Sequence, residues 1–225
     1  MDLREFIAIR KSFNLAHHKS DLSCRLPFSD VAVLALLHAH PKGVCTSELS
    51  NYQHSLRPTT THRTKRLERM GLITRSSRPD DKRCILCAIT PLGEQVYQET
   101  LHFTCKYFSM GKPLAHIVPT RLHFYVIAMA SFELNSSDLV LLSLFIRGNQ
   151  QLSITDIVST IGLLQPTVSM CVVNLEKAGY VERKHTPYCT NFLLTPKGLE
   201  RVQELRQGIN DMVVRRKEHR KSDRS

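Results

Sequence analysis

The sequence predicts a mainly α-helical protein with small β-hairpins, built from two similar halves. Its 225 residues are 42% hydrophobic and include only nine Gly and ten Pro, a composition typical of soluble globular proteins. Residues 29–75 align without a gap with residues 137–183, an internal repeat at an offset of 108. In both copies, helical periodicity is followed by two short strand-like segments.

Composition and charge exclude several classes of protein. No apolar run approaches the ~18 residues of a membrane-spanning helix. The N-terminus has no apolar stretch followed by small residues, so we expect no signal peptide, no membrane contact and a cytoplasmic location. Lys and Arg number 31 against 20 Asp and Glu, and the net charge of +11 favours an anionic partner such as nucleic acid.

Identical residues mark the repeat. Pro58 matches Pro166, and Gly71 matches Gly179. A TPxG sequence then begins at Thr90 and at Thr195, an offset of 105, so the loop before it is three residues shorter in the second copy. We therefore expect two domains, residues 1–112 and residues 113–225.

Each copy has the same predicted order of elements. A lead-in helix is followed by a helix that is apolar on most faces and belongs in the domain centre, a short helix, a longer helix, a hairpin and a final long helix. Ser29 and Ser137 are the expected N-caps of the apolar helices. The Pro pair is expected at the start of the longer helix and the Gly pair just after its end. The predicted lead-in and short helices are Leu3–His17 and Ser47–Tyr52 in the first copy, and Val118–Ser131 and Thr155–Ile161 in the second.

Helix, short helix, turn, helix and hairpin make a winged helix-turn-helix, and two motifs of the first copy point to a family. LERMGLITR (67–75) and RPDDKRCILCAITPLG (78–93) resemble the MarR/SarA family of bacterial transcription regulators. The family pattern is a Leu-Glu-x-x-Gly-Leu helix end, a wing with Asp-(Arg/Lys)-Arg, and Leu-Thr-x-x-Gly. The second copy keeps LEKAGYVER and LLTPKG, but its wing lacks Asp-Lys-Arg. Members usually carry one such domain and act as dimers, so the resemblance implies two winged domains joined by helices in a pseudo-dimer within one chain.

Charge distinguishes the two copies. Residues 29–90 contain ten Lys or Arg and five Asp or Glu, a net charge of +5. Residues 137–195 contain four of each and are neutral. Because phosphate attraction dominates DNA affinity, we expect the first copy to bind DNA more strongly.

The helix before the hairpin is the candidate recognition helix of the first copy. Thr60, Thr64 and Leu67 are expected to face the core, so that Arg63 and its neighbours point outward. The predicted DNA-binding residues are Thr59, Thr61, His62, Arg63, Lys65 and Arg66 on the helix, and Arg75, Arg78, Lys82 and Arg83 on the wing. The family resemblance gives the base-reading positions to Thr61 and His62, a minor-groove role to Arg83 and an orienting ion pair to Asp81. Solvated helix charges and ordinary turn chemistry at Asp81 are the alternatives.

The second copy has a different outward face. Met170 and Val173 are expected to be exposed on its longer helix, where they either pack against protein or contact thymine methyl groups. Packing or degeneracy is the favoured interpretation. The weaker DNA-binding candidates of this copy are Thr167, Ser169, Asn174 and Lys184.

The remaining motifs predict no catalytic or metal site. Cys84 and Cys87 form one CxxC on a predicted strand, where the two positions point to opposite faces, so we expect no zinc site. The seven Cys are expected to be reduced thiols, with Cys45 among the small core residues. The sequence has no GxSxG, P-loop or GxGxxG motif, so we expect neither an enzyme nor a cofactor.

These observations predict a transcription regulator that occupies a promoter site on double-stranded DNA. The resemblance also implies modulation by a small aromatic effector. Three alternatives stay open: a plasmid replication initiator with paired winged helices, a protein-interaction scaffold, and a thiol-based redox sensor.

Overall fold

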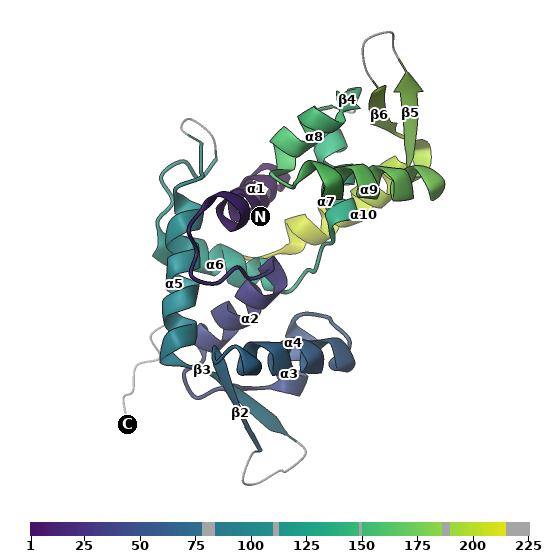
Figure 1. The fold of residues 1–225 in the computed structure, drawn as a ribbon. Helices are drawn as coiled ribbons and strands as arrows, with labels where there is room; N and C mark the ends of the chain where they lie inside the picture. The colour runs from purple at the N-terminus through teal and green to yellow at the C-terminus, as the bar shows by residue number, and fades with distance from the viewer. Residues whose placement is uncertain (78–83, 110–112, 149, 186–189, 215–225) are drawn as a thin grey trace.

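The computed structural model describes residues 1–77, 84–109, 113–148, 150–185 and 190–214. Both halves show the same order of elements (Figure 1), which confirms the predicted mainly helical fold with two hairpins. The elements of the first half are α1 (Leu3–Lys19), α2 (Phe28–Ala39), β1 (Val44–Cys45), α3 (Thr46–Tyr52), α4 (Arg57–Arg69), β2 (Ile73–Ser77), β3 (Ile85–Ile89) and α5 (Pro91–Cys105). Those of the second half are α6 (Pro119–Ala130), α7 (Ser136–Ile146), β4 (Leu152–Ser153), α8 (Ile154–Ile161), α9 (Gln165–Lys177), β5 (Val181–His185), β6 (Thr190–Leu194) and α10 (Pro196–Asp211).

Each half holds a three-stranded antiparallel sheet. The strand orders are β1-β3-β2 and β4-β6-β5, so the hairpin gains a third strand from the segment before the short helix. Arg75 pairs with Cys87 in the first sheet, and Arg183 pairs with Phe192 in the second. The two-residue strands β1 and β4 were not predicted, because two residues are too short for an alternating pattern.

Local signals place the helix ends. Gly71 and Gly179 follow α4 and α9 with φ of +73° and +77°, the left-handed conformation that glycine adopts without strain. The N-cap predictions were wrong, because α2 and α7 start earlier than Ser29 and Ser137. Pro27 precedes α2 without a side-chain cap, and the Asn135 side chain caps α7 by accepting a bond from the Asp138 N–H.

The central helices α2 and α7 lie in the domain centres, as predicted. Residues 31–37 of α2 and 139–144 of α7 are at most 3% exposed. Both belong to one continuous hydrophobic core that includes residues of both halves. Burial on all faces explains why these segments lack the polar stripe of a surface helix.

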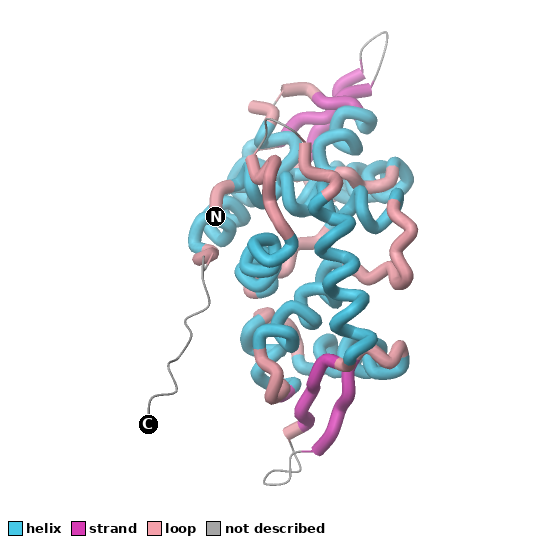
Figure 2. Tube along the Cα trace, turned by 90° about the vertical axis from the view of Figure 1, so that its left-hand side faces the viewer, coloured by secondary structure: helices cyan, strands magenta, loops and turns pink. Residues whose placement is uncertain are grey.

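The lead-in helices connect the halves. Helix α1 contacts α7, α8 and α10 as well as α5, and α6 contacts α2 and α5 of the first half. Gly162 allows α1 to approach α8, since a Cβ atom there would lie 2.9 Å from the Lys11 carbonyl oxygen. The Asn14 amide also donates to the Ile161 carbonyl at 2.8 Å. The two hairpins project from opposite ends of the molecule (Figures 1 and 2).

Within the described ranges, no single helix is long and apolar enough to cross a bilayer. Helices α8 and α9 reach that length and composition only as a pair, bent by 114°.

A buried histidine at the junction of the halves predicts acid sensitivity. His123 of α6 bonds to the Tyr97 hydroxyl at 2.7 Å and contacts the ring of His38, which itself pairs with Glu94. Burial lowers the pKa of His123 to about 4, and His38 adds to that effect while Glu94 opposes it. On acidification, the unfolded chain therefore protonates His123 before the folded chain does. The free energy of unfolding does not depend on this group above about pH 6.5, and it falls as the pH drops from about 6.5 to about 4.

The measurement is the free energy of unfolding by urea at several pH values. His123→Asn places an amide where Nδ1 accepts or donates, but it does not titrate. We expect its stability to fall less steeply than that of the wild type between pH 6.5 and 4. Parallel curves for the two proteins would contradict the prediction.

Candidate nucleic-acid interface

Helix α4 presents a polar outer face at the base of the first hairpin. Thr60, Thr64 and Leu67 are fully buried, as predicted, and fix this helix on the core. The exposed side chains of the helix include Arg57, Thr59, His62, Lys65 and Arg69, while Thr61 and Arg66 are half-buried. Arg69 was not among the predicted site residues, although its place two helical turns after His62 puts it on the same face.

Arg63 lies on the inner face of α4, so its predicted outward position was wrong. It was expected to point outward, but it is only 8% exposed. Its guanidinium donates to the Gln53 amide oxygen at 2.9 Å and to Glu133 at 2.8 Å, and its Nε lies 3.6 Å from Asp30. Position 63 is three residues after Thr60 and four before Leu67, so it falls on the inward stripe of the helix. Arg63 is therefore not available to contact phosphate.

Asp30 ties the recognition helix to α2. Its carboxylate is fully buried and forms an ion pair with Arg66. Burial raises the pKa of Asp30, and the neighbouring guanidinium groups of Arg66 and Arg63 oppose that rise. Because one buried carboxylate holds two cations of α4, this contact fixes both the position and the rotation of the helix.

The wing is described only at its base. Arg75 on β2 pairs with Glu68 at 3.3 Å, and its side chain is largely covered. The predicted wing contacts Arg78, Lys82 and Arg83, and the orienting Asp81, lie outside the described residues.

The second half presents a different face at the equivalent place. Met170 is 67% exposed and Val173 is 38% exposed, as predicted. Asn174 is exposed, Thr167 and Ser169 are half-buried, and Lys184 lies 3.6 Å from Glu182. The three exposed cations of α4, Arg57, Lys65 and Arg69, correspond to Gln165, Val173 and Lys177 of α9. The cationic face is therefore a property of the first half.

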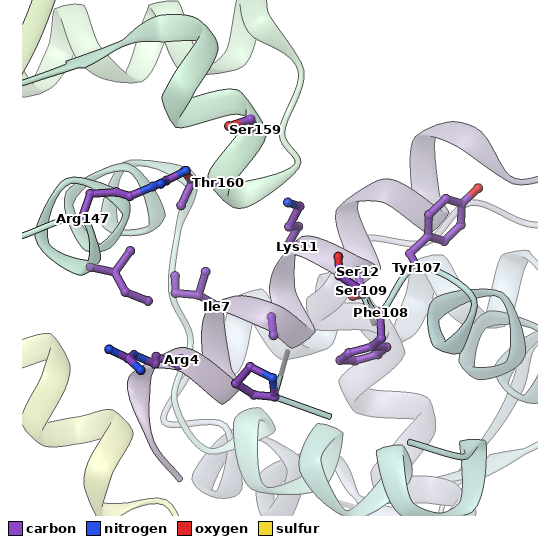
Figure 3. A pocket seen from close by; sticks show the side chains of 13 residues that line it. Arg4, Ile7, Lys11, Ser12, Tyr107, Phe108, Ser109, Arg147, Ser159 and Thr160 are labelled. Atoms are coloured by element: carbon purple, nitrogen blue, oxygen red, sulfur yellow. The ribbon is translucent and has the colours of Figure 1, made fainter. Parts of the chain in front are cut away.

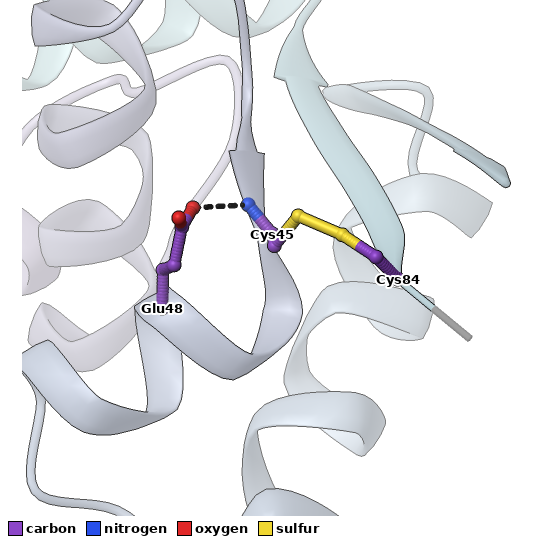
Figure 4. The surroundings of a disulfide bond; sticks show 3 residues. All are labelled: Cys45, Glu48 and Cys84. Carbon is purple, nitrogen blue, oxygen red and sulfur yellow. Dashed lines mark hydrogen bonds between the residues drawn. A yellow bond between two sulfur atoms is a disulfide. The ribbon is translucent and has the colours of Figure 1, made fainter. Parts of the chain in front are cut away.

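A disulfide fastens the root of the first wing. Cys45 at the end of β1 bonds to Cys84, the residue before β3, with the Cα atoms 6.0 Å apart (Figure 4). The Cys45 N–H also donates to Glu48 of α3 at 2.9 Å. The expectation that Cys45 and Cys84 are reduced thiols is wrong for this pair. Pairing of Cys45 with Leu86 across the sheet brings the two cysteines together, and β1 was not predicted.

A cavity of about 240 Å³ lies between α1, the segment after α5, the end of α7 and α8 (Figure 3). Apolar side chains, among them Ile7, Phe108 and Ile146, form part of its lining. Arg4, Lys11 and Arg147 bring three cationic side chains to it. None of the described residues that line the cavity is acidic, so its electrostatic character is positive.

Two family models match parts of the chain. The MarR family model matches residues 28–85, and the IclR helix-turn-helix domain model matches residues 139–185. No curated protein sequence matches the chain.

Several solved structures are similar to parts of the chain. YusO from Bacillus subtilis is 24% identical over 44% of this chain and 67% of its own, with a TM-score of 0.37. The transcriptional regulator BldR from Sulfolobus solfataricus is 21% identical over 64% and 86%, with a TM-score of 0.36. CouR from Rhodococcus jostii RHA1, bound to p-coumaroyl-CoA, is 18% identical over 57% and 87%, with a TM-score of 0.40.

The second half matches a different helix-turn-helix model from the first, in keeping with its lack of an Asp-Lys-Arg wing. The chain therefore contains two winged helix-turn-helix domains, of which the first matches the MarR family model and the second matches the IclR helix-turn-helix domain model.

Proposed function

We propose that this protein regulates transcription by occupying a promoter site on double-stranded DNA, with its first domain supplying most of the affinity. The observation that carries the proposal is the exposed cationic face of α4, which α9 lacks. A recognition helix reads bases near its N-terminus and holds phosphates with its basic residues. Thr59, Thr61 and His62 occupy the first part of α4, and Lys65 and Arg69 follow them.

We further propose that the two domains of one chain take the places of the two subunits of a dimer. The supporting contacts are those of α1 with the second half and of α6 with the first. In this arrangement the domains 1–112 and 113–225 form a pseudo-dimer and need not read a palindrome, because their recognition helices differ.

Selection of genomic DNA fragments by the purified full-length chain tests both proposals. We expect one asymmetric site beside a promoter, bound by a single chain as judged by the mass of the complex. Enrichment of repeated origin-like sites would indicate replication initiation instead. An obligate dimer on a palindrome would refute the pseudo-dimer, and no enrichment at moderate salt would refute DNA binding.

The second domain supports a second candidate function. Leu164, Met170 and Val173 expose apolar side chains on and beside α9, at 51%, 67% and 38%. Exposed apolar groups on a neutral face are typical of protein contacts. A protein-interaction role for this domain is therefore compatible with DNA binding by the first.

The positive cavity is the proposed effector site. It is slightly smaller than the ~300 Å³ at which sites for drug-sized ligands begin, so a single aromatic ring suits it. Its three cations favour a carboxylate on that ring. Because α1 belongs to the first half and α8 to the second, an occupant contacts both halves.

Thermal unfolding in the presence of benzoate tests this site. We expect benzoate to raise the melting temperature in a concentration-dependent way, because a ligand that binds only the folded state stabilises it. Benzylamine, with the same ring and the opposite charge, should have no such effect. Arg147→Gln should reduce the shift caused by benzoate, and an equal shift with either compound would refute the proposed charge preference.

A further inference from the structure

The first recognition helix is held by a residue of the second half. Glu133 lies in the segment between α6 and α7, and its carboxylate accepts a hydrogen bond from the Arg63 guanidinium at 2.8 Å. The Glu133 side chain is 48% exposed, whereas that of Arg63 is 9% exposed. The bond therefore runs from the edge of the second half into the interior of the first helix-turn-helix.

Charge balance explains why this bond matters. Asp30 serves both Arg63 and Arg66, so the buried group would carry an excess positive charge without a second carboxylate. Glu133 supplies that carboxylate. Removing one partner from a buried ion pair is costly, since the remaining charge stays desolvated.

A second bond ties the same unit to the second half. The Tyr52 hydroxyl at the end of α3 donates to the Ile127 carbonyl of α6 at 3.2 Å. Both helices of the first helix-turn-helix therefore touch α6 or the segment that follows it. At the place equivalent to Arg63, the second half has Cys171, which carries no charge. The second half therefore holds the recognition helix of the first by an ion pair, and among the described residues the first half has no equivalent ion pair to α9.

We propose that Glu133 is a positioning residue, which fixes the orientation of α4 through Arg63 and makes the DNA affinity of the first domain depend on the second half. The inference rests on the proposed DNA-binding function. A recognition helix must enter the major groove at a defined angle, so a helix free to rotate on the core adopts the binding orientation less often and binds DNA with lower affinity. Glu133 itself is an anion and does not contact phosphate.

The test is the affinity of the full-length Glu133→Gln variant for the DNA site that the wild type selects, measured across a series of salt concentrations. Removing an acidic residue raises the net charge, which by itself would tighten DNA binding. We expect the opposite, a loss of about tenfold, because α4 adopts the binding orientation less often in this variant. The slope of log Kd against log salt should stay unchanged, because the phosphate contacts are the same once DNA is bound.

Four further variants define the interpretation. Glu204→Gln makes the same charge change at an exposed residue that pairs with Arg201 of its own helix, and it should bind as the wild type does or slightly more tightly. Arg63→Gln also breaks the contacts of Arg63 with Gln53 and Asp30, so it should bind at least as weakly as Glu133→Gln. The double variant should bind no more weakly than Arg63→Gln, because Glu133 acts only through Arg63. Glu133→Asp keeps the charge, withdraws the carboxylate by one methylene, and should also weaken binding.

The outcomes separate this inference from the function on which it rests. Wild-type affinity in Glu133→Gln, or additive losses in the double variant, would overturn the positioning role. A wild-type chain that binds no DNA would instead overturn the proposed function. The melting temperature of each variant is measured by circular dichroism, and DNA affinity is measured at a temperature at which all variants are folded.

Discussion

Replacing Lys65 and Arg69 with Ala is expected to weaken DNA binding about a hundredfold at moderate salt. Both side chains are exposed on the outer face of α4, where they can reach phosphates on either side of the groove. Each lost charge-assisted contact corresponds to about tenfold in affinity. Each lost contact also reduces the slope of log Kd against log salt by about 0.9, so the double variant should lose about two units of slope.

The matched control is the double variant Lys177→Ala and Lys184→Ala. Lys177 stands where the first half has Arg69, and the change in net charge is the same. Because the second face is neutral and apolar around Met170, we expect less than about a threefold loss of affinity. Equal losses from the two pairs would show that both domains hold DNA alike and would contradict the dominance of the first.

Much of the fold could be predicted because its signals are local. Gly71 and Gly179 each end a helix through their own backbone conformation. Thr90 and Thr195 each cap the next helix by accepting a bond from the N–H three residues later. Such signals involve neighbours in the sequence, and the repeat presents each of them twice.

The contacts that could not be predicted join distant segments. Arg63 was placed outward because helical spacing marks a face but not its width, and its partner Glu133 is 70 residues away. The bond between Cys45 and Cys84 spans 39 residues and depends on a strand of two residues. The candidate cavity draws on α1, α7 and α8, which meet only because the lead-in helices cross between the halves.

We expect loss of the Cys45–Cys84 disulfide to have the largest effect on stability. It closes a loop that contains α3, α4 and β2, the whole of the first helix-turn-helix. In the chain-entropy description, a cross-link over 39 residues lowers the conformational entropy of the unfolded chain and so raises the free energy of unfolding by about 4 kcal/mol. Reduction, or Cys84→Ser, should therefore lower the free energy of unfolding by up to about 4 kcal/mol and the melting temperature by about 8–16 °C.

The reductant itself provides the control for this prediction. Dithiothreitol should lower the melting temperature of the wild type and of Cys24→Ser, which removes a half-buried free thiol. It should leave Cys84→Ser unchanged, because that variant has already lost the cross-link. Hydrogen exchange should locate the effect, since β1 is held by only two residue pairs to β3 and should lose protection first once the bond is open. A wild type that melts at the same temperature with and without reductant would show that this bond does not constrain the domain.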